Sequence, residues 1–566
     1  MNRRQLLTVL ASTGIGSPVL HRAISTMASS EEFGIENLKE AEWITGIELS
    51  DEEREEILGQ VQRTQAGHEA LREIETDYLT APAVHFKPIV EKRPVQFLNR
   101  NARADESDVE QLPTSDRDIA FLPVGKLAWF IKTGQLSSVR LTKIYLDRLK
   151  KYGPMLRCVI SLTEILALQQ AKRADEEIKS GYYRGPLHGI PWGAKDLIDV
   201  EGYPTTWGIP HYRERFPEQT ATVAKRLEEA GAVLVAKLSL GALAQGDKWF
   251  KGMTRSPWSP RRGSSGSSAG SASATVAGLV GFSLGSETLG SILSPSIRCG
   301  ATGMRPTFGR VSRYGCMPLS WTMDKIGPIC RSVEDCALVF DAIHGHDGKD
   351  PTTDSYEFSW PKLDSFVGTK VGYRKSRTPV EEREDLKMLK RLGCELVEMS
   401  LPTGYPLRAL FNTISVEGAS VFDSMLREGH TEGWNTWTNT FRAAQHISAV
   451  DYLRYMRVRT KLMKEFEETI ADVDFIVNMR DLVHTNFTGH PSIVFPVGYE
   501  DDGDGGKKII PMEVTGHLYA DDRLASFADA CQKQVVAHQI RPELESWLEK
   551  FKAGTMDEKE EKQDLA

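Results

Sequence analysis

Apolar positions change their spacing along the chain, and the change predicts two kinds of structure. Leu127, Phe130 and Ile131 recur at helical spacing within a region of helical character. Further on, short β-branched or apolar runs alternate with helical stretches. A helix predicted over 222–230, for example, is followed by a buried-strand candidate at 232–236. This alternation favours an α/β fold in which helices cover a sheet.

Further strands are predicted at 366–373, 395–399 and 474–477. The runs 493–497 and 509–514 flank an acidic, glycine-rich turn, which predicts a β-hairpin. Together these elements predict the fold class α/β: a single compact unit with a mixed β-sheet core covered by helices on both faces.

The region before this α/β part is acidic and helical in character. Ser50 and Glu53 have the spacing of a capping box, which predicts that a helix begins at Asp51. A proline-containing connector follows this helix. We therefore divide the chain after its first 28 residues into a helical N-terminal extension and connector (29–104), the α/β domain (105–553) and a disordered charged tail (554–566).

Composition narrows the class of protein. The chain has 566 residues and a net charge of −8, which argues against general nucleic-acid binding because that needs a basic surface. There is no apolar run of ~18 residues, so no transmembrane helix is expected. The seven cysteines include no C-x-x-C pair, so neither a zinc knuckle nor a redox motif is predicted.

The first 28 residues have the layout of an export signal. Arg3 and Arg4 precede a moderately apolar stretch over 6–20, and Ala28 is an acceptable cleavage point. Adjacent arginines of this kind are typical of a twin-arginine signal peptide. We therefore expect an exported protein, periplasmic or secreted. The alternative is a frayed N-terminus on a cytoplasmic protein.

Two segments carry the candidate chemistry. The Gly/Ser run 263–271 could be a flexible linker, but core-like sequence follows it directly at 272–280. Dense glycine and serine also occur where backbone crowds a reacting atom and donates N–H groups to it. Lys195 lies among apolar and small residues. Burial there would lower the pKa of its amine, and a fall of ~3 from ~10.4 would make it a base near pH 7.

Five segments in order resemble the amidase signature family of serine hydrolases. The resemblance spans roughly residues 115–545. Its segments are GPLHGIP (185–191), WSP with the Gly/Ser run (258–271), GMRPTFGRV (303–311), DKIGP with RSVED (324–335) and TGHPS (488–492).

The resemblance implies a catalytic trio of Lys195, Ser267 and Ser291. In the family, the residue matching Ser291 attacks the amide carbon and forms an acyl-enzyme. The residue matching Ser267 follows a cis peptide bond and passes the proton, and the residue matching Lys195 is the base. The chain is thus predicted to be an amidase that hydrolyses a linear carboxylic amide.

The resemblance also implies an oxyanion hole made by the backbone N–H groups of Thr288, Leu289, Gly290 and Ser291. The expected partner is a small amide substrate, with no metal, no organic cofactor and no nucleic acid. The protein could form a homo-oligomer. Within the family, the A subunit of a glutamyl-tRNA amidotransferase is an alternative, but it needs intracellular partners, which disagrees with export.

The chain departs from the family pattern at three positions. Leu289 replaces a glycine, Leu293 replaces an arginine and Ala269 replaces a glycine. None of these changes removes a catalytic group. They leave open a second hypothesis, a catalytically degenerate binding protein with the same fold.

Two further hypotheses come from other patterns. Residues 266–270 match G-x-S-x-G, which would make Ser268 the nucleophile of an α/β-hydrolase-type esterase. That motif requires a strand just before it, and the prolines within 256–262 argue against one. His344 and His346 lie in a Gly/Asp-rich turn, where a metal site is the less favoured interpretation.

Overall fold

The computed structural model describes residues 33–74, 84, 111–360, 365–479, 481–503 and 505–556. The predicted signal peptide, the connector and residues 557–566 lie outside this part. The chain forms two compact units. Among the described residues, the helical unit comprises 33–74, Gly404–Thr431 and Thr436–Lys461. The α/β unit comprises Val84, 111–360, 365–403, Glu432–Asn435 and the described residues of 462–556. No described helix is both long enough and apolar enough to cross a membrane.

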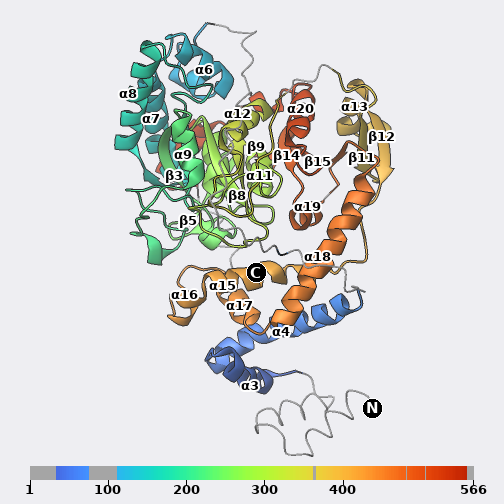
Figure 1. The fold of residues 1–566 in the computed structure, drawn as a ribbon. Helices are drawn as coiled ribbons and strands as arrows, with labels where there is room; N and C mark the ends of the chain where they lie inside the picture. Colours follow the sequence, from blue (N-terminus) through green and yellow to red (C-terminus); the bar gives the residue numbers. More distant parts are fainter. Residues whose placement is uncertain are drawn as a thin grey trace, which may run out of the picture. The chain divides into compact units, whose positions relative to one another are not determined.

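The core of the α/β unit is an 11-stranded mixed sheet (Figure 1). Its strands, in spatial order, are β1 (Val159–Leu162), β3 (Val233–Leu238), β2 (Pro191–Lys195), β8 (Phe282–Glu287), β10 (Lys325–Cys330), β9 (Thr302–Arg305), β14 (Ser492–Asp501), β15 (Lys507–Gly516), β13 (Phe475–Val477), β11 (Lys370–Arg374) and β12 (Glu395–Met399). Strand β2 is parallel to β3 and β8, and β11 is parallel to β12 and β13. The remaining pairs are antiparallel, so the predicted mixed sheet is confirmed.

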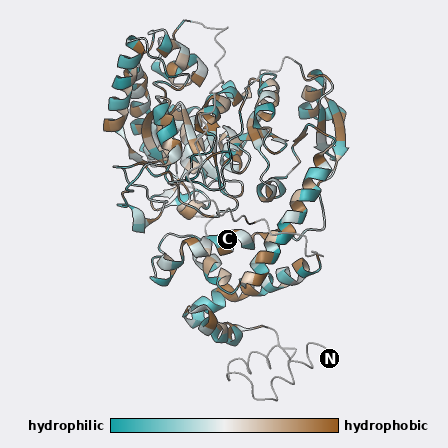
Figure 2. Ribbon diagram, viewed as in Figure 1, coloured by the Kyte–Doolittle hydropathy of each residue, from teal (hydrophilic) through white to brown (hydrophobic). Residues whose placement is uncertain are grey.

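Helices cover this sheet in two layers. Ile329 of β10 packs against Ala272 and Val276, whereas the next residue, Cys330, faces Cys336. Because successive strand residues point to opposite faces, α10 and α12 lie on opposite sides. Figure 2 shows α7 and α8 banded in hydrophilic and hydrophobic colours, as expected for helices with one buried side.

The helices of this unit are α5 (Asp116–Ala120), α6 (Val124–Lys132), α7 (Ser138–Leu156), α8 (Glu164–Lys179), α9 (Thr222–Glu229), α10 (Ala269–Val276), α11 (Leu293–Cys299), α12 (Val333–Ile343), α13 (Glu384–Arg391), α19 (Leu482–Thr488), α20 (Asp521–Gln532) and α21 (Leu544–Lys552).

Short elements complete the unit. They are the ladders β4 (Lys248–Trp249) with β5 (Gly252–Met253) and β6 (Arg255–Ser256) with β7 (Ser259–Gly263), and the 3₁₀ turns η1 (Pro210–Tyr212), η2 (Ala242–Ala244), η3 (Val380–Glu382) and η4 (Ala537–Gln539). The predicted hairpin is confirmed as β14 and β15, in which Phe495 pairs with Met512. The predicted helix and strand around residue 230 are confirmed as α9 and β3.

The helical unit joins the N-terminal helices to a segment that follows β12. Its helices are α3 (Ile35–Thr45), α4 (Asp51–Arg72), α14 (Leu407–Leu410), α15 (Asn412–Val421), α16 (Asp423–Arg427) and α17 (Trp437–Ala444), with the first part of α18 (Ala449–Ile470). The predicted capping box is confirmed, because Ser50 accepts from the N–H of Glu53 and Glu53 accepts from that of Ser50. Arg442 of α17 pairs with Glu53. The N-terminal extension thus packs against residues that the sequence had placed within the 105–553 domain.

Candidate functional site

The predicted catalytic residues meet at one edge of the sheet because β2 and β8 are parallel neighbours. Ala194 pairs with Leu284, so the two strands end side by side. Lys195 is the last residue of β2, and β8 ends at Glu287, shortly before Ser291. The carboxyl ends of parallel strands lie at the same edge, so the sheet brings Lys195 to the turn that carries Ser291.

Lys195 is completely buried and surrounded by serine oxygens. Its Nζ lies 2.7 Å from the Oγ of Ser267, 2.9 Å from that of Ser286 and 3.0 Å from that of Ser268. Burial lowers its pKa to about 7, although Asp324 and Glu287 act in the opposite direction. Near neutral pH a large fraction of this amine is therefore uncharged and able to accept a proton.

The Gly/Ser segment is part of the packed interior. The Gly266–Ser267 peptide is cis, as the family resemblance implies. A Cβ on Gly266 would lie 1.7 Å from the carbonyl oxygen of Gly246, so no larger residue fits there. The N–H of Ser268 donates to the carbonyl of Ser291 at 3.1 Å. Glycine therefore serves close backbone packing here, and the linker interpretation is wrong.

The predicted proton relay needs two contacts, Lys195 with Ser267 and Ser267 with Ser291, and the structure shows the first of them. Lys195 and Ser267 are within hydrogen-bond distance, and the backbones of Ser268 and Ser291 are bonded. Among the described residues, no hydrogen bond connects the hydroxyls of Ser267 and Ser291. Catalytic hydrogen bonds are often longer before substrate binds. Ser291 is 9% exposed, so water reaches only a small part of this residue.

The turn before Ser291 presents backbone N–H groups with no acceptor. Within the described part of the chain, nothing accepts a hydrogen bond from the N–H of Leu289, Gly290 or Ser291. Gly290 has a φ of +81°, a conformation that favours glycine. Thr288, the fourth predicted residue, is fixed by its hydroxyl, which donates to Asp324 at 2.6 Å. Unpaired N–H groups beside a candidate nucleophile are the kind of donors that an oxyanion hole requires.

Glu287 is a functional residue to which the sequence analysis gave no role. One carboxylate oxygen accepts from the N–H groups of Ile292 and Leu293 at 2.8 and 3.0 Å. The other oxygen accepts from Arg305 and Asn486 at 2.8 and 2.9 Å. Burial alone would raise its pKa, but the charges of Arg305 and Lys325 lower it to about 2. Glu287 is thus a buried anion that holds the turn directly after Ser291.

The three departures from the family pattern fit this structure. Leu293 is almost fully buried in an apolar cluster with Ile292 and Val494. Ala269 is the buried first residue of α10, and Leu289 is half-buried. None of the three lies between Lys195 and its serine partners.

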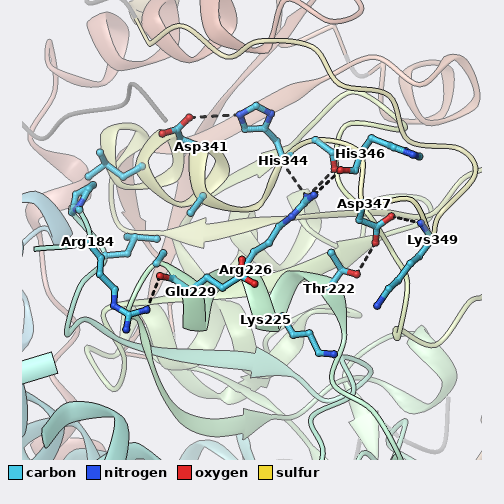
Figure 3. A pocket seen from close by; sticks show the side chains of 17 residues that line it. Arg184, Thr222, Lys225, Arg226, Glu229, Asp341, His344, His346, Asp347 and Lys349 are labelled. Carbon is cyan, nitrogen blue, oxygen red and sulfur yellow. Dashed lines mark hydrogen bonds and ion pairs between the residues drawn. The ribbon is translucent and has the colours of Figure 1, made fainter. Parts of the chain in front are cut away.

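A cavity of about 480 Å³ adjoins this site, because Ser286 and Thr288 form part of its wall. A second cavity, of about 550 Å³, lies around the ends of α9 and α12 (Figure 3). Lys195, Ser267 and Ser291 line neither cavity, but only the first includes residues next to them in the site. Two of its charged side chains are bonded within the fold: Arg226 donates to the carbonyls of Ile343, His344 and Gly345, and Asp347 accepts from Thr222.

The Gly/Asp-rich turn with His344 and His346 also lies at the second cavity. His346 contacts Thr353 through its ring nitrogen, and Asp350 is paired with Arg313 at 2.9 Å. Among the described residues, no group of three or more histidine, cysteine or acidic side chains is arranged to hold a metal ion.

The prediction that residues 256–262 form no strand is wrong. Residues 256–262 do contribute to a strand, since β6 and β7 pair through Ser256 and Ser259. Pro257 lies in the intervening turn, and Pro260 is tolerated because each strand of a two-stranded ladder has a free edge. This ladder is separate from the large sheet, so it does not provide the strand of a nucleophile elbow.

The downstream histidines do not reach Ser268. His484 contacts the carbonyl of Pro402, His517 contacts that of Val473, and His490 contacts Thr488. In the described structure Ser268 instead contacts Lys195 and Ser286. The histidine that an α/β-hydrolase triad requires is therefore not supplied by these three residues.

Comparison with known proteins agrees with the family resemblance seen in the sequence. The protein-family profile described as Amidase matches residues 140–479. The A subunit of glutamyl-tRNA(Gln) amidotransferase from Thermoanaerobacter pseudethanolicus is 32% identical over 453 residues, covering 69% of this chain and 92% of that protein.

Solved structures show the same relationship. The peptide amidase of Stenotrophomonas maltophilia superposes with a TM-score of 0.65 at 27% identity, covering 74% of this chain and 98% of that one. The glutamyl-tRNA(Gln) amidotransferase A subunit from Thermotoga maritima gives a TM-score of 0.59 at 25% identity, with coverages of 75% and 97%.

Proposed function

Because the chain belongs to the amidase signature family, we propose that it hydrolyses the C–N bond of a linear carboxylic amide through an acyl-enzyme on Ser291. The observation that carries this proposal is the buried amine of Lys195, which lies 2.7 Å from Ser267 and has a pKa of about 7. A lysine in that state is a base at physiological pH.

The first step forms the acyl-enzyme. Ser291 Oγ bonds to the carbonyl carbon and gives its proton to Ser267, which passes its own proton to the neutral amine of Lys195. The electron pair of the C=O π bond moves to oxygen. The N–H groups of Leu289, Gly290 and Ser291 stabilise this oxyanion, and one such donor is typically worth ~3–4 kcal/mol.

Collapse of the tetrahedral intermediate breaks the C–N bond. The ammonium of Lys195 returns its proton through Ser267 to the leaving nitrogen, which departs as ammonia or an amine. Water then attacks the acyl carbon, losing a proton along the same relay, and the carboxylic acid is released from Ser291. The relay ends in its starting state, so no other proton donor is needed.

A second candidate is a role within an amidotransferase complex, since relatives about 30% identical are named as the A subunits of glutamyl-tRNA(Gln) amidotransferases. We favour the hydrolase because we also propose that residues 1–28 export the chain, away from tRNA. The two candidates differ in whether the chain acts alone.

The test is ammonia release from a panel of primary amides by the purified chain without partner or tRNA. We expect turnover by the wild type and loss of at least 10³-fold in Ser291→Ala and Lys195→Ala, with unchanged thermal unfolding for Ser291→Ala. Turnover that survives in Ser291→Ala would overturn the proposal. Turnover that appears only with added partner proteins would favour the amidotransferase role.

A further inference from the structure

The cavity beside the catalytic residues is walled mainly by apolar side chains. Its wall includes Thr288 and also Ser286, whose hydroxyl lies 2.9 Å from the amine of Lys195. Met317 and Leu319 are almost fully buried in its wall, whereas Trp321 is 47% exposed. Other apolar wall residues include Leu197, Pro318 and Ile326. A volume of about 480 Å³ is in the usual range for a small-molecule site.

The loop that carries these apolar residues is fixed to the reacting centre. Asp324 accepts from the N–H groups of Leu319 and Ser320 at 2.8 and 2.9 Å. The same carboxylate accepts from the hydroxyl of Thr288 at 2.6 Å. The apolar wall and the oxyanion turn are therefore held together by one carboxylate, so a substituent in the cavity would be positioned relative to Ser291.

The charged groups that line the cavity have partners within the protein. Arg313 pairs with Asp350 and donates to the hydroxyl of Thr352 at 2.8 Å. Lys325 donates to the carbonyl of Thr288 and to Asn486 at 3.2 and 2.8 Å.

The remaining lysine in the wall, Lys349, lies 4.7 Å from the centre of the Tyr314 ring. Arg313 and Lys325 are already engaged, and Lys349 is exposed. A substrate carboxylate in the buried part of the cavity, beside Met317 and Leu319, would therefore lose its hydration without gaining a dedicated partner.

Resting on the proposed function, we propose that this cavity selects amides with a neutral, apolar substituent, such as an aryl or branched alkyl group. Met317, Leu319 and the partly exposed Trp321 are the specificity-determining residues. This apolar substituent is carried either by the acyl part or by the amine part of the scissile amide, and the cavity would bind it in the same way in both cases. Amides that carry a carboxylate at this position are rejected.

Binding to Ser291→Ala tests this inference without turnover. Calorimetry would compare 3-phenylpropanamide with 3-(4-carboxyphenyl)propanamide, and N-benzylacetamide with N-(4-carboxybenzyl)acetamide. We expect the neutral member of at least one pair to bind at least tenfold more tightly. Preference in the first pair places the acyl side chain in the cavity, and preference in the second places the amine group there.

Substitution of Trp321 links the preference to this cavity. In the Ser291→Ala background, Trp321→Ala should weaken binding of the preferred neutral amide roughly tenfold, since apolar contact area is lost. Trp321→Arg should lower the ratio of the two affinities, neutral amide over carboxylate amide, at least tenfold. Trp43→Ala removes another exposed tryptophan, which lines neither cavity, and should change nothing.

Equal binding within both pairs would overturn the inference, as would equal effects of Trp321→Ala and Trp43→Ala. Kinetics of the wild type on the whole amide panel separate the two proposals. If the cavity selects apolar substituents, acetamide should be hydrolysed more slowly than 3-phenylpropanamide or N-benzylacetamide. Failure of turnover on every amide of the panel, together with intact selective binding, would contradict the proposed function and leave the inference on the cavity standing.

Discussion

The pH dependence of amide hydrolysis follows from the protonation state of Lys195. With a pKa of about 7, the amine is neutral in about one tenth of the molecules at pH 6 and in about nine tenths at pH 8. If the neutral amine is the base, kcat/KM should rise about tenfold between these values and reach a plateau above pH 8. The rise is expected in kcat/KM because this parameter reports the free enzyme.

The assay measures ammonia release at low substrate concentration from pH 5.5 to 9.5, on an amide that does not titrate in this range. Lys195→Arg is the matched control. Its guanidinium stays protonated at every pH tested, so the variant should be inactive throughout. Asp324→Asn removes a charge that raises the pKa of Lys195, so the rise should move to lower pH.

Two results would refute this reasoning. A lysine exposed to water would keep a pKa near its ordinary value of 10.5, and kcat/KM would then rise about 100-fold from pH 6 to pH 8 without a plateau. Activity in Lys195→Arg would show that Lys195 is not the base.

Three further predictions concern single side chains. Ser268→Ala removes one neutral hydrogen bond to the base and should lower kcat/KM by only about fivefold, whereas the α/β-hydrolase hypothesis requires complete loss of turnover. Glu287→Gln leaves the charge of Arg305 buried without its partner and should lower the free energy of unfolding by about 3–5 kcal/mol in a urea titration; a change below about 1 kcal/mol would contradict the assigned role. Ser50→Ala removes the capping contact with Glu53 and should lower the free energy of unfolding by about 1 kcal/mol while leaving the rate of hydrolysis unchanged. A fall in kcat/KM of the folded variant would contradict this prediction and show that the cap supports the site.

The sequence predicted those elements that depend on residues close together in the chain, such as a hairpin and the start of a helix. The hairpin of β14 and β15 follows from two β-rich runs around a glycine-rich turn, and the start of α4 follows from the capping box of Ser50 and Glu53. The lowered pKa of Lys195 could be anticipated because its sequence neighbours are apolar and small.

Contacts between distant segments could not be predicted in this way. Glu287 meets Arg305 and Asn486 only after β8, β9 and α19 are assembled, and nothing in its immediate sequence indicates these partners. The pairing of Arg442 with Glu53 likewise joins residues almost 400 positions apart. The short β6–β7 ladder was missed because Pro257 and Pro260 argue against a strand unless the ladder has free edges.

The central claim is that Ser291 is a nucleophile activated by Lys195, and covalent labelling tests it most directly. The intact chain would be treated with a fluorophosphonate probe at pH 8, digested and mapped by mass spectrometry. The account predicts a single phosphonylated residue at Ser291, with labelling strongly reduced in Lys195→Ala and retained in Ser50→Ala. Modification of Ser268 instead, or labelling of Ser291 that is equally fast without Lys195, would contradict it.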